Sequence, residues 1–140
     1  MERLSSLKAK WLSLLLEVSR WNSLQPFVSY MYQHLFRHLP IDRLGENAHW
    51  IAFHHPQPDY PLHILILPMQ DTIPALPFAP DDDPDLYADL FRLVQQLIAQ
   101  FDLEAQGYRL ITNGGPNQSI PIWHWHLISE GTHEPGEPHA

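Results

Sequence analysis

Residues 120–128 read IPIWHWHLI and place two histidines one residue apart in an otherwise apolar run. Isoleucine, tryptophan and leucine favour a β-strand, in which successive side chains point to opposite faces of the sheet. His124 and His126 should therefore share one face with the isoleucines around them. The two tryptophans and Leu127, which alternate with these residues, should share the other face. We expect one face to pack into the core and the other to form a site.

Length and composition limit what that site can bind. The chain has 140 residues, 44% of them hydrophobic, which suits one compact domain. Its formal net charge of -8 disfavours nucleic acid polymers and anionic membranes as partners, because such surfaces need clustered Lys and Arg. A small phosphorylated ligand held by backbone amides is compatible with this charge. The absence of cysteine excludes disulfides, thiolate metal sites and cysteine nucleophiles.

The first third of the chain is expected to be helical. Apolar residues recur every three or four positions between Leu4 and Trp21, a stripe that should pack on the protein's own sheet or form a dimer contact. A second helix is expected over residues 26–39. His34 and His38 lie four apart on it, and we interpret them as ordinary histidines because no third metal ligand is indicated. The apolar run WLSLLLEV is too short to span a bilayer and no signal-peptide cleavage site is visible, so a cytoplasmic location is expected.

From Ala48 onward the pattern changes to short strands around one helix. Two strands, at residues 48–55 and 62–68, are separated by the turn-rich segment PQPDYP. A helix should start at Pro84, with Asp83 as its cap and an apolar stripe that continues to Phe101. Further strands are expected at 108–112 and 120–128. This order predicts the α+β class, with a mostly antiparallel sheet that carries one long packed helix.

The pair of His124 and His126 permits more than one interpretation. Both rings could be polar residues on a sheet edge. They could also be metal ligands, because together with Glu130 they resemble part of the cupin pattern of two histidines and a following glutamate. Only ten residues follow Glu130, too few to close a cupin barrel, and we expect no metal. The third interpretation is a phosphate-binding site, and it depends on the residues upstream.

Those upstream residues resemble the histidine-triad, or HIT, superfamily of nucleotide hydrolases and transferases. The family carries alternating histidines on a strand, commonly preceded by Gln-Ser and, further upstream, by Tyr-Arg and an Asn-Gly loop. The residues that match in order are Tyr108, Arg109, Asn113, Gln118, Ser119, His124 and His126. The segment WIAFHHPQPDYPLHILILP is similar to the family's first hairpin through Pro61, His63 and Pro68. The resemblance covers residues 50–128, more than half of the chain.

The resemblance implies a domain organisation and a ligand class. Residues 45–130 would form a HIT-like domain. Outside the resemblance, the apolar periodicity predicts that residues 1–44 form a two-helix extension packed on this domain, and the Gly, Pro and charged residues of 131–140 predict a flexible tail. The ligand would be a nucleotide or a related phosphate ester or phosphoramidate. No cofactor is implied, and a homodimer is expected because family members commonly pair through their central helix and sheet edge.

The resemblance also implies roles for individual residues. His124 falls at the position of the family's nucleophile, which attacks an α-phosphate and forms a nucleotidyl-imidazole intermediate. An imidazole suits this role because it is nucleophilic near neutral pH and leaves readily once protonated. His126 would donate a hydrogen bond to phosphate oxygens. The residues implied for phosphate or nucleotide binding are Asn113, Gly115, Asn117, Gln118, Ser119 and His55.

Three positions depart from the family pattern. Ile122 replaces the first triad histidine, Asp71 replaces a histidine after the first hairpin, and His55 replaces an acidic residue that would bind the ribose hydroxyls. The carbonyl of Ile122 would still be available to orient His124. Two functions therefore stay open: a hydrolase or nucleotidyltransferase with a nucleotidyl-histidine intermediate, or a catalytically impaired nucleotide-binding or interaction protein that kept the fold. We interpret His63 as a structural histidine.

Overall fold

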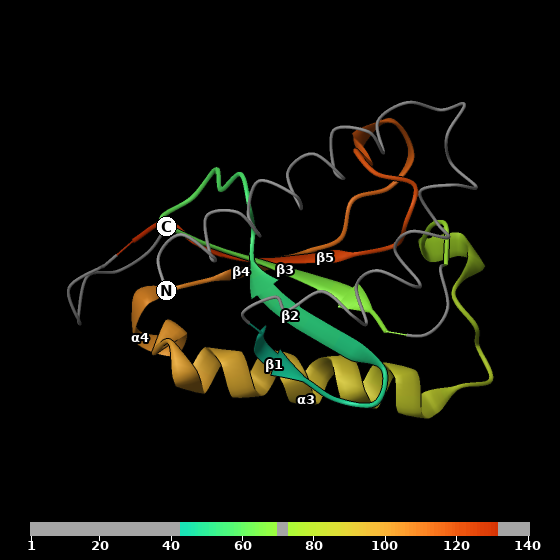
Figure 1. The fold of residues 1–140 in the computed structure, drawn as a ribbon, viewed down its shortest axis with the longest axis horizontal. Helices are drawn as coiled ribbons and strands as arrows, with labels where there is room; N and C mark the ends of the chain where they lie inside the picture. Colours follow the sequence, from blue (N-terminus) through green and yellow to red (C-terminus); the bar gives the residue numbers. More distant parts are fainter. Residues whose placement is uncertain (1–42, 70–72, 132–140) are drawn as a thin grey trace.

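A single antiparallel sheet organises the part of the chain that the computed structural model describes, residues 43–69 and 73–131 (Figure 1). Its five strands lie in the order β1-β2-β3-β5-β4, and every neighbouring pair is antiparallel. The strands are β1 (Arg43–Glu46), β2 (Trp50–His54), β3 (Leu62–Pro68), β4 (Arg109–Ile111) and β5 (Trp125–Ser129). The predicted N-terminal helices, Asp71 and most of the predicted tail lie outside the described residues.

One long helix, α3 (Pro84–Gln100), covers one face of this sheet (Figure 1). Its start is as predicted: the Oδ1 atom of Asp83 accepts a hydrogen bond from the backbone N–H of Leu86 at 3.3 Å, and Pro84 occupies the first turn. The buried stripe of the helix comprises Leu86, Leu90, Leu93, Val94 and Leu97. The prediction of an antiparallel sheet that carries one packed helix is confirmed.

The core lies between α3 and one face of the sheet. The indole rings of Trp50 and Trp123 meet edge to face, with centroids 5.3 Å apart, and Nε1 of Trp50 donates a hydrogen bond to the carbonyl of Leu86 at 2.7 Å. Leu127 belongs to the same cluster, and Trp125 packs against it. Trp123, Trp125 and Leu127 therefore share the helix-covered face, as the alternation predicts, which leaves the two histidines for the other face.

Three short helices complete the described elements. They are a 3-10 turn η2 (Leu76–Phe78), a helix α4 (Leu103–Gln106) after α3, and a 3-10 turn η3 (Gly115–Asn117) in the loop before β5. Gly115 has a φ angle of 56°, a left-handed conformation that glycine adopts without steric cost. None of the helices in the described residues is long and apolar enough to cross a membrane.

Two boundaries differ from those expected. The last strand begins at Trp125 rather than at Ile120, so His124 immediately precedes β5 instead of lying within a strand. The sequence also gave no indication of β1, which spans the expected domain boundary between residues 44 and 45. A Cβ atom on Gly45 would lie 2.8 Å from a methyl carbon of Leu93, so the absence of a side chain lets β1 approach α3 closely.

Candidate functional site

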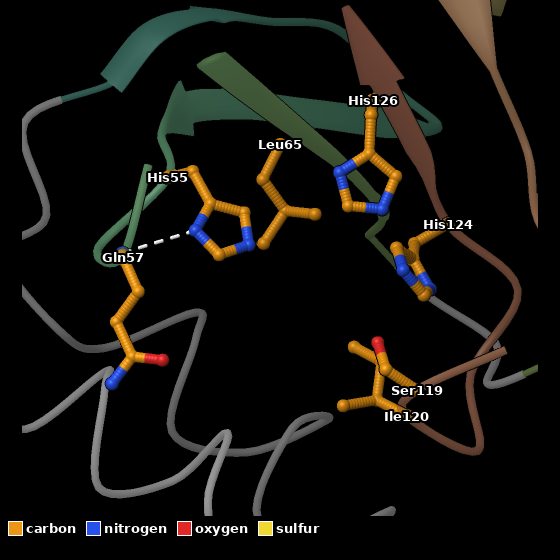
Figure 2. Close-up of a pocket in the computed structure, with 7 residues that line it drawn as sticks. All are labelled: His55, Gln57, Leu65, Ser119, Ile120, His124 and His126. Carbon is orange, nitrogen blue, oxygen red and sulfur yellow. Dashed lines mark hydrogen bonds between the residues drawn. The ribbon is translucent and has the colours of Figure 1, made fainter. Parts of the chain in front are cut away.

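The candidate site is a pocket on the face of the sheet opposite α3 (Figure 2). Histidines from the turn after β2, from β5 and from the residue before β5 surround it, and a serine of the loop before β5 closes one side. Its lining residues are His55, Gln57, Leu65, Ser119, Ile120, His124 and His126. No lysine, arginine or carboxylate is among them.

The backbone fixes the orientation of His124. Its Nδ1 atom lies 2.6 Å from the carbonyl oxygen of Ile122, and only an Nδ1–H donor can make this hydrogen bond. The hydroxyl of Thr112 donates to the carbonyl of His124 at 2.8 Å and so ties this segment to the end of β4. Burial lowers the pKa of His124 below its usual value, although the bond to Ile122 acts in the opposite direction. His124 is therefore neutral near pH 7 and keeps a lone pair on Nε2.

A histidine on the neighbouring strand β3 determines the tautomer of His126. The backbone N–H of Asp59 donates to Nδ1 of His63 at 3.1 Å, so the proton of the neutral His63 ring resides on Nε2. That Nε2–H donates to Nδ1 of His126 at 2.9 Å. The proton of the neutral His126 ring consequently resides on its own Nε2. His63 on β3 thus prepares His126 to act as a hydrogen-bond donor.

A backbone group in the turn after β2 determines the tautomer of His55 in the same way. The backbone N–H of Gln57 donates to Nδ1 of His55 at 3.0 Å, which leaves the ring proton on Nε2 (Figure 2). The ring stacks on His63 with centroids 4.3 Å apart and an interplanar angle of 26°. One backbone hydrogen bond and one ring stack therefore hold an N–H donor at this end of the pocket.

Burial keeps the four imidazoles neutral. It is the largest cause that lowers the pKa of His55, to about 4, and of His126, to about 3, and the neighbouring imidazoles lower both values further. Burial also lowers the pKa of His63, against an opposing effect of the Asp59 carboxylate. At neutral pH the pocket therefore offers donors and one nucleophilic nitrogen without a formal positive charge.

The loop before β5 is tied to the segment before η2. The side-chain amide of Gln118 donates to the carbonyl of Pro74 at 2.6 Å and to that of Ile120 at 2.9 Å. The backbone N–H of Trp123 donates to the carbonyl of Ile73 at 2.6 Å. These bonds hold the loop that carries Ser119 and Ile120, which line the pocket beside His124 (Figure 2).

Comparison with known proteins gives this arrangement a family. A family model described as the HIT domain matches residues 37–133, well over half of the chain. The chain belongs to the HIT family. A HIT-like protein of Chlamydia pneumoniae is 34% identical over 89 residues, which cover 64% of this chain and 79% of that protein. An uncharacterized HIT-like protein of Rickettsia prowazekii is 29% identical over 91 residues, which cover 65% and 76% of the two chains.

Solved structures of the HIT family show the same fold. A HIT family hydrolase from Legionella pneumophila aligns with a TM-score of 0.62 at 27% identity and covers 71% of this chain and 89% of that chain. A histidine triad nucleotide-binding protein from Candida albicans aligns with a TM-score of 0.61 at 24% identity and covers 80% and 86% of the two chains. The latter, at this level of identity, supports the fold alone.

Four of the eight site residues expected from the sequence line the pocket of this HIT domain: His55, Ser119, His124 and His126. The other four, Asn113, Gly115, Asn117 and Gln118, do not line it. Gln118 instead supports the loop through its side-chain amide. The roles assigned to these eight residues stay predictions, since position alone does not test them.

Sequence reasoning did not identify Gln57, Leu65 and Ile120 as lining residues, nor His63 as the partner of His126. The alternation within β3 carried one usable signal, because His63 and Leu65 share a face in any strand. The pairing of Leu65 with His126 across β3 and β5 brings that face to the pocket. Such pairing between distant strands could not be read from the two segments separately.

The imidazoles of His55, His63 and His126 offer nitrogens that all lie within 4.8 Å of one another, close enough to consider a metal. Two features disfavour a metal in this arrangement. The Nδ1 atoms of His55 and His63 already accept backbone N–H groups, so their Nε2 atoms carry protons. The ring of His55 also lies nearly parallel to those of His63 and His126, at 26° and 25°, whereas a shared ion must lie close to the plane of every ligating ring.

Proposed function

We propose that this HIT protein binds a nucleotide, or a related phosphate ester or phosphoramidate, and hydrolyses it or transfers its nucleotidyl group through His124. The observation that carries the proposal is the hydrogen bond from Nδ1 of His124 to the carbonyl of Ile122, which leaves the Nε2 lone pair of a buried, neutral imidazole available. The nucleotide as ligand is supported by the resemblance of residues 50–128 to the HIT nucleotide hydrolases and transferases, and hydrolysis by the Legionella pneumophila relative, whose name describes a hydrolase.

The proposed reaction has two steps. Nε2 of His124 attacks the α-phosphorus, a P–N bond forms, and the bond from phosphorus to the leaving group breaks; the leaving group departs with its electron pair and takes up a proton. Water, or another acceptor, then attacks the same phosphorus, the P–N bond breaks, and the acceptor loses its proton. The carbonyl of Ile122 stabilises the Nδ1–H of the imidazolium intermediate throughout.

Neutral donors stabilise the phosphoryl group in this proposal. Nε2–H of His126 and the hydroxyl of Ser119 lie on the pocket wall beside His124 (Figure 2). Donors that are held in place before the reaction stabilise negative charge as it develops in the transition state. The rings of His124 and His126 have centroids 4.9 Å apart, which lets one phosphate group contact both.

Turnover by wild type and His124→Ala tests the proposal. Both proteins are incubated with an adenosine phosphoramidate and with a dinucleoside polyphosphate, while nucleotide release and the intact protein mass are followed. We expect release by the wild type, a nucleotidyl adduct, and a loss of at least about 10²-fold in rate in His124→Ala. The matched control is His54→Ala, because His54 is exposed and adjacent to His55 but does not line the pocket.

Nucleotide binding without turnover would contradict the catalytic part and favour the second function, a catalytically impaired binding protein. One structural feature favours that alternative. The side chain at position 122 is a buried isoleucine, so the third imidazole of a triad is absent from the described site. No binding at all would contradict both.

We also propose a homodimer. Phe91 on α3 is 54% exposed and Tyr108, immediately before the edge strand β4, is 41% exposed. Large apolar side chains on a helix and beside a sheet edge suit burial against a second copy. Sedimentation velocity should give a dimer for the wild type and a monomer for Phe91→Glu, and a monomeric wild type would contradict the proposal. A cytoplasmic location stays a prediction from the sequence.

A further inference from the structure

We propose that His55 forms a second ligand subsite, which donates a hydrogen bond to an oxygen of a phosphate group next to the phosphate at His124. The site would then select compounds with two adjacent phosphates and would not discriminate ribose from deoxyribose. This inference rests on the proposed function, because it places the reacting phosphate at His124 and His126. It concerns the chemistry of the ligand at the opposite end of the same pocket.

The ring of His55 can make a hydrogen bond to a ligand only as a donor. Its Nδ1 atom is occupied by the backbone N–H of Gln57 at 3.0 Å, so the free ring position is an N–H. Figure 2 shows this second nitrogen on the pocket side of the ring. An N–H pairs with an acceptor oxygen, and phosphate oxygens are acceptors throughout. The ring has no free acceptor for a hydrogen bond donated by a sugar hydroxyl.

The lining of the pocket also bears on whether a ribose can bind beside His55. Two neighbouring hydroxyl groups are bound most strongly by a carboxylate, which accepts two hydrogen bonds at once. No carboxylate lines the pocket among the described residues. The Asp59 carboxylate raises the pKa of His55 and of His63 against the larger effect of burial. This residue is exposed, and it is its backbone N–H that donates to His63. The amide oxygen of Gln57 and the hydroxyl of Ser119 can each accept a hydrogen bond, but the described wall has no charged group that accepts both protons of a ribose diol.

The imidazoles of the pocket are closely spaced and held in place. The ring of His55 lies 5.9 Å from that of His126, and the ring of His126 lies 4.9 Å from that of His124, between centroids. Because the ring of His126 neighbours both other rings, two phosphates that share one bridging oxygen can contact all three imidazoles. The stack on His63 holds His55 in place before any ligand arrives, so little side-chain entropy is lost on binding.

Burial supports the role of His55 as a neutral donor and sets the pH range in which the ring is neutral. The pKa of His55 is lowered to about 4, so the ring is a neutral donor near pH 7. A neutral N–H recognises the position of an oxygen without the charge that would attract any anion. Selectivity between one phosphate and two should therefore depend on the geometry of this ring.

Binding measurements with matched pairs of probes test the inference. The probes are inorganic phosphate against pyrophosphate, and AMP against 2′-deoxy-AMP, titrated by calorimetry into the full-length protein. The variants are His55→Asp, which replaces the donor by an acceptor, and His55→Gln, which keeps an N–H donor. His54→Asp is the control, because it adds the same charge one residue away on an exposed position that does not line the pocket.

We expect the wild type to prefer pyrophosphate over phosphate and to bind AMP and 2′-deoxy-AMP within about twofold, since the free ring position of His55 cannot accept a hydrogen bond from a ribose hydroxyl. His55→Asp should reduce the pyrophosphate preference by about tenfold and create a preference for AMP, because a hydrogen bond to a charged group carries about this factor. His55→Gln and His54→Asp should both retain the wild-type ratios.

The inference is overturned if His55→Asp changes the ratios no more than His54→Asp does, if the wild type does not prefer pyrophosphate over phosphate, or if it prefers AMP over 2′-deoxy-AMP by more than about twofold. Imidazole NMR signals separate this failure from that of the proposed function. Probes that shift the His124 signals without any dependence on position 55 overturn only the subsite. Probes that leave the His124 signals unchanged overturn the proposed function and the subsite with it.

Discussion

At the scale of single residues, a main-chain atom rather than a side chain orients the candidate nucleophile. His124 bonds to the carbonyl of Ile122, and any residue at position 122 would supply that carbonyl. The replacement of a histidine by isoleucine therefore removes an imidazole from the site and leaves the orientation of His124 intact. The change at this position is from a polar imidazole to an apolar side chain, and the isoleucine side chain is only 1% exposed.

The hydrogen-bond partners predict one tautomer for each imidazole of the site. We expect the Nδ1–H form for His124, and the Nε2–H form for His55, His63 and His126, because each ring pairs with a backbone group or with a ring already fixed by one. Long-range proton–nitrogen NMR spectra at pH 7 distinguish the two forms by the shifts of the two ring nitrogens.

Assignment of those signals follows from single histidine-to-glutamine variants, with His54→Gln as the control that should leave the site signals in place. His126 in the Nδ1–H form would contradict the bond from His63 as we interpret it. His124 in the Nε2–H form would remove the lone pair on which the proposed reaction depends.

At the scale of elements, the helices and strands that a single continuous segment specifies were predicted from the sequence. The helix α3 combines a capping aspartate, a proline in the first turn and an apolar stripe, and it formed where those signals stand. The strands β2 and β3 were predicted because continuous apolar runs flank a proline-rich turn, and they pair directly with each other. In each case the sequence of the segment itself was enough to predict the helix or the strand.

Elements that depend on distant partners were predicted less well. The strand β1 has only four residues, RLGE, and it pairs with β2 through an irregular register. Its position also depends on contact between Gly45 and α3, which no local pattern could indicate. The segment 120–124 is apolar and alternating, yet its Trp123 N–H bonds to Ile73 rather than to a strand, so β5 starts later than the pattern indicates.

The candidate site shows the same division. The sequence placed His124 and His126 on one face because their spacing of two residues sets that relation in a strand. It could not place His63 against His126, because residues 63 apart meet only through the pairing of β3 with β5. It also could not assign the ring protons, which are set by backbone groups of the turn at Gln57 and Asp59.

At the scale of the whole molecule, neutral buried imidazoles make stability depend on pH. In the unfolded chain an imidazole titrates near pH 6.5. In the folded protein the pKa of His55 is lowered to about 4 and that of His126 to about 3. As the pH falls below 6.5 the unfolded chain binds protons that the folded protein does not, so the free energy of unfolding decreases, and it goes on decreasing down to those folded-state values.

The net charge predicts the opposite trend, which makes the experiment decisive. The formal charge of -8 becomes smaller as the pH falls, so repulsion between like charges weakens and the folded state should gain stability. We expect the imidazoles to dominate between pH 7 and pH 5, where His55 alone should cost about 1–2 kcal/mol of unfolding free energy. Urea unfolding at intervals of half a pH unit measures this slope, above the range in which most carboxylates titrate.

His55→Gln isolates the contribution of one ring. This variant should lose less stability than the wild type between pH 7 and pH 5, by about the 1–2 kcal/mol assigned to His55, because glutamine does not titrate. His54→Gln replaces an exposed neighbour and should follow the wild-type curve. A His55→Gln curve that runs parallel to the wild-type curve between pH 7 and pH 5 would mean that His55 accepts a proton in the folded state, and the neutral donor on which the second subsite depends would then be wrong.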